Sequence, residues 1–199
     1  MAPEKPFSQA CENNKQPILE RIRHIFTSPG TILEIGTGTG QHAVHFASSL
    51  SHVVWQPSDR PGATGFSLGW IEDAALPNVL PPLELDVASE SWPINCIDGA
   101  FSANTAHIMT WEEVKAMFTG LAKHLDKGMP FCLYGPFSYG GIHTSDSNRQ
   151  FDQHLRSQAP HMGIREMDDL LELAERAGFR LENDHQMPAN NRLLVLLKL

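Results

Sequence analysis

The sequence has 199 residues, of which 41% are apolar and 19% charged, and its formal net charge is −8. These values are ordinary for a soluble globular chain of one domain. The acidic balance, with lysines and arginines spread singly, argues against a nucleic-acid partner, because such binders usually carry a basic patch. No apolar run approaches the ~20 residues that span a bilayer, so we expect no membrane insertion.

The three cysteines favour a reducing compartment. Cys11, Cys96 and Cys132 are scattered and show no C-x-x-C spacing, which suits free thiols. The first residues lack the apolar core of an export signal. We therefore expect a cytoplasmic protein, and the oligomeric state stays open.

Strands and helices are predicted to alternate along the chain. Apolar runs bounded by turn residues predict strands at 32–35, 53–59, 83–85, 97–102, 129–134, 179–186 and 192–199. Helical spacing predicts helices from residue 13, with Pro17 in the first turn, to a break at Pro29, and at about 41–50, 110–125, 147–157 and 165–177. Residues 1–12 are expected on the surface, 62–75 as a loop and helix, and the polar, glycine-hinged stretch 137–150 as a binding loop or lid.

The glycine-rich turn after the first strand is the most informative motif. Gly36, Gly38 and Gly40 follow a buried run and precede a helix, which is a nucleotide-type cradle. The dinucleotide fingerprint G-x-G-x-x-G would need glycine at position 41, where Gln41 stands. The pattern that begins at Glu34 instead resembles the first motif of class I methyltransferases that use S-adenosyl-L-methionine (SAM). That resemblance implies that the glycine turn lies under the methionine part of SAM and that Glu34 faces its ammonium group.

Two further carboxylates follow predicted strands. Asp59 lies nineteen residues after Gly40, where a carboxylate accepts hydrogen bonds from both ribose hydroxyls of NAD or SAM. Asp86 closes the third strand. The class I resemblance implies that Asp86 takes the adenine amino group and that the backbone N–H of Val87 meets a ring nitrogen. NAD remains the alternative cofactor, disfavoured by Gln41.

Asn104 and His107 come directly after the fourth strand. Open α/β sheets bind ligands beyond the carboxyl ends of their strands, so both residues are candidates for catalysis, and Asn104 also for cofactor binding. Histidine titrates near neutrality and can act as a base or a hydrogen-bond donor. Packing or substrate contact is the other interpretation of His107.

With these elements placed, the chain resembles one small family, the methyltransferase-like 26 proteins and their bacterial relatives. The stretches that carry the resemblance are NKQPIL (14–19), EIGTGTGQH (34–42), WQPSD (55–59), LYGPF (133–137), TSDSN (144–148), FD (151–152), GIR (163–165) and MPANN (187–191). It implies a Rossmann-like class I methyltransferase fold over residues 1–199, with residues 1–28 as an N-terminal capping segment and helix. The implied sheet has seven mostly parallel strands, one antiparallel strand inserted beside strand five, and helices on both faces.

Polar residues near several strand ends are candidates for an acceptor pocket. They are Asn14, Lys15, Tyr134, Tyr139, His143, Asn148, Asn190 and Asn191. His42 and His45 lie three apart on a helix, but no H-E-x-x-H or cysteine cluster supports a metal, so none is expected.

The expected function is methyl transfer from SAM to an unidentified small-molecule acceptor, with S-adenosylhomocysteine (SAH) as the second product. A protein methyltransferase and a non-catalytic SAM-binding protein are the alternatives. SAM activates its own methyl group, so such an enzyme needs alignment and water exclusion more than a catalytic triad.

Overall fold

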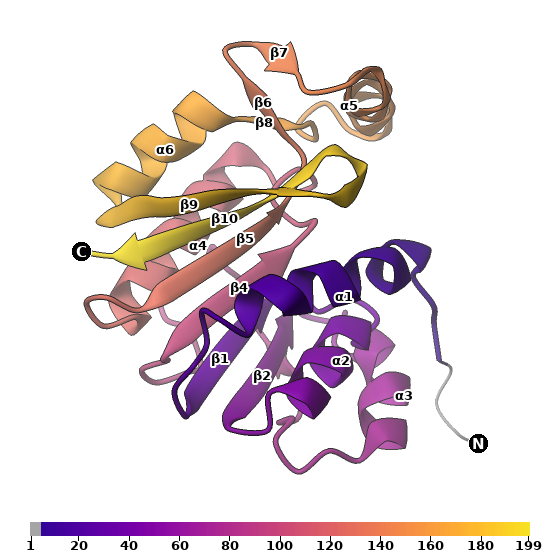
Figure 1. The fold of residues 1–199 in the computed structure, drawn as a ribbon, viewed down its shortest axis with the longest axis vertical. Helices are drawn as coiled ribbons and strands as arrows, with labels where there is room; N and C mark the ends of the chain where they lie inside the picture. The colour runs from indigo at the N-terminus through magenta and orange to yellow at the C-terminus, as the bar shows by residue number, and fades with distance from the viewer. Residues whose placement is uncertain (1–4) are drawn as a thin grey trace.

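The computed structural model describes residues 5–199, so the first four residues of the expected capping segment lie outside it. Its main sheet has seven strands in the order β3-β2-β1-β4-β5-β10-β9 (Figure 1). Their bounds are β1 Gly30–Ile35, β2 Val53–Asp59, β3 Leu83–Glu84, β4 Gly99–Ala103, β5 Pro130–Gly135, β9 Phe179–Met187 and β10 Asn191–Lys198. This order and the antiparallel β10 between β5 and β9 confirm the predicted sheet.

Helices cover both faces of the sheet. They are α1 Gln9–Ile22, α2 Gln41–Ser49, α3 Gly65–Ala74, α4 Trp111–His124, α5 Asp146–Gln158 and α6 Met167–Arg176. On one face, Ile18 of α1 and Phe46 of α2 pack on Ile32 and Trp55. On the other face, α4 and α6 cover the sheet (Figure 1). Within residues 5–199 we find no helix with the length and apolar content needed to cross a bilayer.

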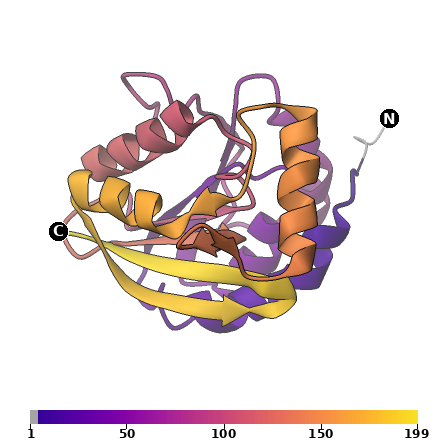
Figure 2. The same ribbon diagram turned by 90° about the horizontal axis from the view of Figure 1, so that it is seen from above.

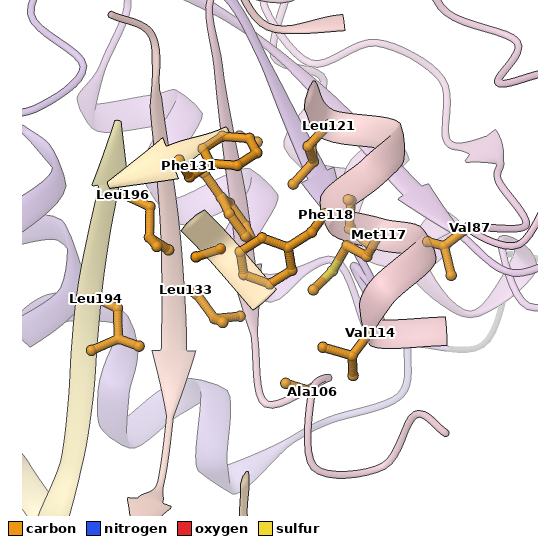
Figure 3. Packing of buried hydrophobic residues seen from close by; sticks show 14 of the residues in the cluster. Val87, Ala106, Val114, Met117, Phe118, Leu121, Phe131, Leu133, Leu194 and Leu196 are labelled. Atoms are coloured by element: carbon orange, nitrogen blue, oxygen red, sulfur yellow. The ribbon is translucent and has the colours of Figure 1, made fainter. Parts of the chain in front are cut away.

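The core explains why the strands are apolar on both faces. In β1, Ile32 belongs to the cluster under α1 and α2, whereas Leu33 and Ile35 belong to the opposite cluster. Figure 3 shows the opposite cluster, in which Phe118 of α4 packs against Phe131 of β5. Strands buried on both sides of a parallel sheet read as continuous apolar runs, and this is why the sequence predicted them.

The prediction for residues 137–150 was wrong. The stretch 137–150 is not a structureless loop: it forms β6 (Phe137–Tyr139), β7 (Ile142–His143) and the start of α5. Gly140 and Gly141 have φ values of +60° and +76° and make a hairpin turn, and both of their N–H groups donate to Glu166. With β8 (Arg165–Glu166), these strands make a second small sheet.

The first helix also begins earlier than predicted. It starts at Gln9 instead of residue 13, because the Ser8 hydroxyl caps it by accepting from the N–H of Cys11 at 3.3 Å. Pro17 therefore lies inside α1 and not in its first turn.

Segments from both ends of the chain meet at the carboxyl edge of the sheet. The turn η1 (Pro188–Asn190) between β9 and β10 lies at this edge, since Arg192 pairs with Gly135 at the end of β5. Figures 1 and 2 show α5 beside this turn, and the Asn148 side chain donates to the Asn190 carbonyl at 3.0 Å.

Candidate functional site

The loop after β1 turns on three glycines with left-handed backbone. Their φ values are +76° at Gly36, +56° at Gly38 and +81° at Gly40. At Gly36 a Cβ would lie 2.4 Å from the Thr105 side chain, whereas at Gly38 it would meet no heavy atom of the described chain within 4 Å. The loop is closed against protein at Gly36 and open at Gly38, where a ligand can approach the backbone.

Glu34 is buried beneath this loop, with 2% of its surface exposed. Its Oε2 accepts from Thr37 Oγ1 and from Trp55 Nε1, each at 2.9 Å. Burial raises the pKa of Glu34 to about 7, although these two hydrogen bonds act in the opposite direction. The carboxyl group therefore changes charge near neutral pH, directly under the glycine loop.

Asp59 ends β2 and lies against the open part of the loop. Its Oδ2 accepts from the N–H of Gly38 at 2.9 Å, and its Oδ1 accepts from the N–H of Arg60 at 2.8 Å. Each carboxylate oxygen has more than one lone pair, so both can accept a further hydrogen bond. The structure thus places Asp59 at the loop apex.

Asp86 and Val87 lie at the same edge, after β3. The N–H of Leu85 donates to the Asp59 carbonyl at 2.8 Å, which fixes this segment beside the end of β2. Asp86 is exposed and accepts from the N–H of Ala88 at 2.9 Å, while Val87 is buried.

Asn104 and His107 lie together at the end of β4. Asn104 has a positive φ of 58°, and its N–H donates to the Tyr134 carbonyl at 2.9 Å. A Cβ on Gly135 would lie 3.9 Å from Asn104 Oδ1 and 3.8 Å from His107 Nδ1, so both side chains reach the same place. Burial, followed by the positive charge of Arg165, lowers the pKa of His107 to about 4, so its imidazole is neutral at pH 7.

Arg165 fixes the loop that carries His107. Its Nε donates to the Ala106 carbonyl at 2.8 Å, and its Nη2 donates to the carbonyl of Met109. The N–H of Gly163 donates to the His107 carbonyl at 2.9 Å. The GIR stretch (163–165) therefore positions the candidate catalytic loop, and no local sequence pattern predicted this role.

A cavity of about 530 Å³ opens next to Asn104 and His107. Its walls come from α1, the end of β4, β5 and the residue after it, α5, and the turn between β9 and β10. The lining residues are Ala10, Asn13, Asn14, Asn104, His107, Tyr134, Pro136, Ser147, Asn148, Phe151, Pro188, Ala189 and Asn191.

Four of the eight candidate pocket residues line this cavity, namely Asn14, Tyr134, Asn148 and Asn191. The other four do not. Lys15 pairs with Glu12 at 2.6 Å, the Tyr139 hydroxyl donates to Asp184 at 2.8 Å, His143 lies 3.8 Å from the Asp152 carboxylate, and Asn190 offers its backbone carbonyl to Asn148.

A buried hydrogen bond joins the cavity to the helix that follows the glycine loop. His42 Nε2 lies 2.6 Å from Asn14 Oδ1, and the His42 ring stacks on Phe46. Burial lowers the pKa of His42 to about 3, so it is neutral and Nε2 donates. Asn14 and Asn191 also flank the Tyr134 hydroxyl. No local sequence pattern indicates that His42 orients a cavity residue.

Gln41, which disfavoured the dinucleotide interpretation, ties the N-terminal segment to the glycine loop. Its Oε1 accepts from the N–H of Ser8 at 2.6 Å and from Thr39 Oγ1 at 3.0 Å. Its Nε2 donates to Glu12 at 3.4 Å. Among residues 5–199 no group of three or more His, Cys, Asp or Glu side chains is arranged to hold a metal ion.

The strand order and the glycine loop define the Rossmann-like fold of class I methyltransferases. An O-methyltransferase family protein from Burkholderia thailandensis is similar, with a TM-score of 0.80, 14% identity, and coverage of 95% of this chain and 57% of that one. The mitomycin 7-O-methyltransferase MmcR matches with a TM-score of 0.82 and 14% identity over 96% of this chain and 54% of its own.

The SAH-bound methyltransferase CalO1 of calicheamicin biosynthesis matches with a TM-score of 0.75 and 15% identity, over 94% of this chain and 54% of its own. The chain thus spans little more than half the length of these solved structures, and at such identities the likeness is one of fold. By sequence, the chain belongs to the family described as "Protein of unknown function (DUF938)", whose model matches residues 5–198.

Proposed function

We propose that this chain is a SAM-dependent methyltransferase that acts on a small-molecule acceptor, and that it is related to the methyltransferase-like 26 proteins. The observation that carries the proposal is the placement of Asp59. Its carboxylate is fixed on the N–H of Gly38 where the glycine loop is open, and Asn104 and His107 stand at the same sheet edge.

The residues at this edge fit the parts of SAM. The open backbone at Gly38 suits the methionine part, and the free lone pairs of Asp59 suit the ribose hydroxyls. Asp86 and the N–H of Val87 would take the adenine, with Asn104 beside the methionine part. Glu34 would add negative charge under the loop, which favours the cationic end of the cofactor.

When bound, SAM supplies an electrophilic methyl group on a sulfonium sulfur. The chain's own task is to hold the acceptor in line and to keep water out. The neutral imidazole of His107 can take the proton that the acceptor loses, and Asn104 can orient the acceptor beside it. A pKa of about 4 makes His107 a weak base, so we expect an acceptor atom with a free lone pair, or a hydroxyl group acidic enough to lose its proton during the reaction.

The volume of the cavity favours a small molecule over a protein as the acceptor. Its volume of about 530 Å³ falls in the range of roughly 300–1,000 Å³ that holds small ligands. A protein acceptor would have to insert one side chain into this space. Metabolite extracts and protein extracts, each incubated with labelled SAM, separate the three cases. A small-molecule methyltransferase labels the first, a protein methyltransferase labels the second, and a non-catalytic SAM-binding protein labels neither.

We also propose the cytoplasm as its compartment, because Cys11, Cys96 and Cys132 are all free thiols in the structure.

Calorimetry with SAM, SAH and NADH tests the cofactor assignment. Asp59→Ala should weaken SAM binding by about 1.5–3 kcal/mol, since a charge-assisted hydrogen bond contributes about that much. Asp126→Ala is the matched control: it removes the same charge from an exposed turn before β5, at the opposite edge of the sheet. Unchanged affinity in Asp59→Ala, or binding of NADH in place of SAM, would refute the assignment.

A further inference from the structure

The chemistry of the cavity lining differs from that of the rest of the chain. The protein has 15 lysines and arginines and 23 aspartates and glutamates, yet none of those within the described residues 5–199 lines the cavity. Five of the lining residues are asparagines, at positions 13, 14, 104, 148 and 191. An amide side chain both donates and accepts hydrogen bonds and carries no charge.

The one titratable base in the lining is also uncharged. His107 is neutral at pH 7 because burial and the nearby Arg165 lower its pKa. Arg165 itself does not line the cavity: its guanidinium donates to the carbonyls of Ala106 and Met109 and lies over the Trp111 ring. The positive charge of Arg165, which acts on His107, is thus engaged by backbone oxygens.

Apolar and aromatic surface makes up the rest of the walls. Phe151 stands edge-on to the His107 ring, with 5.2 Å between their centroids, and Pro136 and Pro188 lie in the same lining. Flat, rigid walls of this kind suit a planar ring.

A charged ligand would lose hydration on entering this cavity and would meet no opposite charge among the lining residues that the structure describes. Such burial is costly unless the charge is paired. An uncharged polar ligand loses much less, because the asparagine amides replace its hydrogen bonds with water.

We propose that the cavity selects uncharged, planar acceptors that carry amide or hydroxyl groups, and that it rejects their carboxylate and ammonium analogues. This inference rests on the proposed function only in calling the ligand a methyl acceptor. The selection by charge depends on the cavity lining alone.

Three probes of nearly equal size and shape test the selection: benzamide, benzoate and benzylammonium. Their binding is followed through the asparagine side-chain amide signals in nitrogen-15 NMR spectra of the full chain. Benzamide should bind in the millimolar range expected for a fragment, and about tenfold or more tighter than either charged probe. Equal or tighter binding of benzoate or benzylammonium overturns the proposal, and so does a failure of benzamide to shift these signals.

A pair of isosteric variants tests whether the discrimination between charged and uncharged probes arises in the cavity lining or from the overall charge of the protein. Asn13 lines the cavity and is exposed, and Asn13→Asp would add one negative charge there. This variant should improve binding of benzylammonium by about threefold or more relative to benzamide. Asn183→Asp adds the same charge on the exposed edge strand β9, outside the lining, and should change the binding of neither benzylammonium nor benzamide. Equal effects of the two variants would assign the preference to overall charge and overturn the proposal.

Failure here is distinguishable from failure of the proposed function. The probes are titrated without cofactor, and SAM is titrated separately by calorimetry. If SAM does not bind but benzamide is preferred, the proposed function fails and the selective cavity stands. If SAM binds and the charged probes bind as well as benzamide, the selective cavity is refuted and the proposed function stands.

Discussion

The glycine-loop edge and the cavity lie side by side but are built from opposite chemistry. Around the loop, Glu34, Asp59 and Asp86 supply carboxylates, whereas the cavity is lined by amides, a phenol and a neutral imidazole. The two regions meet where Thr105 packs on Gly36 and where His42 donates to Asn14. A cationic cofactor on the acidic side and an uncharged acceptor on the other would account for this division.

The two regions also differ in how the chain builds them. The loop edge comes mostly from one continuous β-α-β unit, β1 to β2, with Leu85 added beside Asp59. The cavity needs five segments, from α1 near the start of the chain to the turn before β10 near its end. Changes at the loop should therefore act locally, while changes in the cavity should also affect how distant segments hold together.

The largest effect is expected from alanine at Gly36, compared with alanine at Gly38. Both positions have positive φ, which costs an L-residue about 1–2 kcal/mol. At Gly36 the added Cβ would also meet Thr105 at 2.4 Å. Gly36→Ala should lower the free energy of unfolding by about 2–5 kcal/mol, since overpacking adds about 1–3 kcal/mol to the backbone cost. Gly38→Ala should lower it by the backbone cost alone, about 1–2 kcal/mol.

Urea denaturation measures both values, and SAM calorimetry on Gly38→Ala completes the comparison. This variant should stay folded yet bind SAM weakly, because its methyl group occupies the open space over the loop. Equal losses of stability at the two positions would show that the loop is not open at Gly38.

The acid sensitivity of folding should come partly from the cavity side. Burial lowers the pKa of His42 to about 3, below the ordinary value of 6.5 in the unfolded chain. Between these values the unfolded state binds a proton that the folded state does not. Stability is therefore full above about pH 6.5 and falls as the pH drops, by about 1.4 kcal/mol per pH unit for this group.

His42→Gln keeps a donor for Asn14 and removes this titration, so stability should fall less steeply between about pH 6 and pH 4. His154→Gln is the control, because His154 is exposed on α5. Denaturation at several pH values compares the three proteins. The same slope in wild type and His42→Gln would mean that His42 is not held neutral.

The smallest expected effect concerns Glu34 and the acidic side. Its pKa of about 7 means that deprotonation is completed as the pH rises past neutrality. A ligand with an ammonium group prefers the charged carboxylate, so SAH should bind up to about tenfold tighter near pH 8 than near pH 6. Glu34→Gln should abolish the dependence while keeping acceptors for Thr37 and Trp55. A flat profile in the wild-type protein would remove Glu34 from the recognition of the ammonium group.

Most of the fold could be predicted from local sequence patterns. The apolar run before Gly36 predicted β1, and helical spacing over 110–125 predicted α4, which begins where the Thr110 hydroxyl accepts from the N–H of Glu113 at 3.1 Å. Strands were also predicted at 179–186 and 192–199, and β9 and β10 confirm both. These features depend on residues close in sequence, so the sequence alone exposes them.

The errors occurred where distant contacts decide the structure. Glu166 holds the turn at Gly140 and Gly141 and makes strands of a stretch that looked like a loop. Of the polar residues expected around the acceptor, Lys15 and Tyr139 pair with carboxylates elsewhere. The approach of α1 and α5 to one cavity determines which side chains line it, and no local pattern encodes that approach.

The most direct test of the division between the two regions is a crystal structure of the SAH complex. We predict that the ribose hydroxyls bind the Asp59 carboxylate and that the SAH sulfur lies within about 8 Å of the His107 ring, which leaves room for an acceptor atom at ~3–3.5 Å from the transferred methyl carbon. SAH bound away from Gly38 and Asp59, or a sulfur that faces away from Asn104 and His107, would contradict the account.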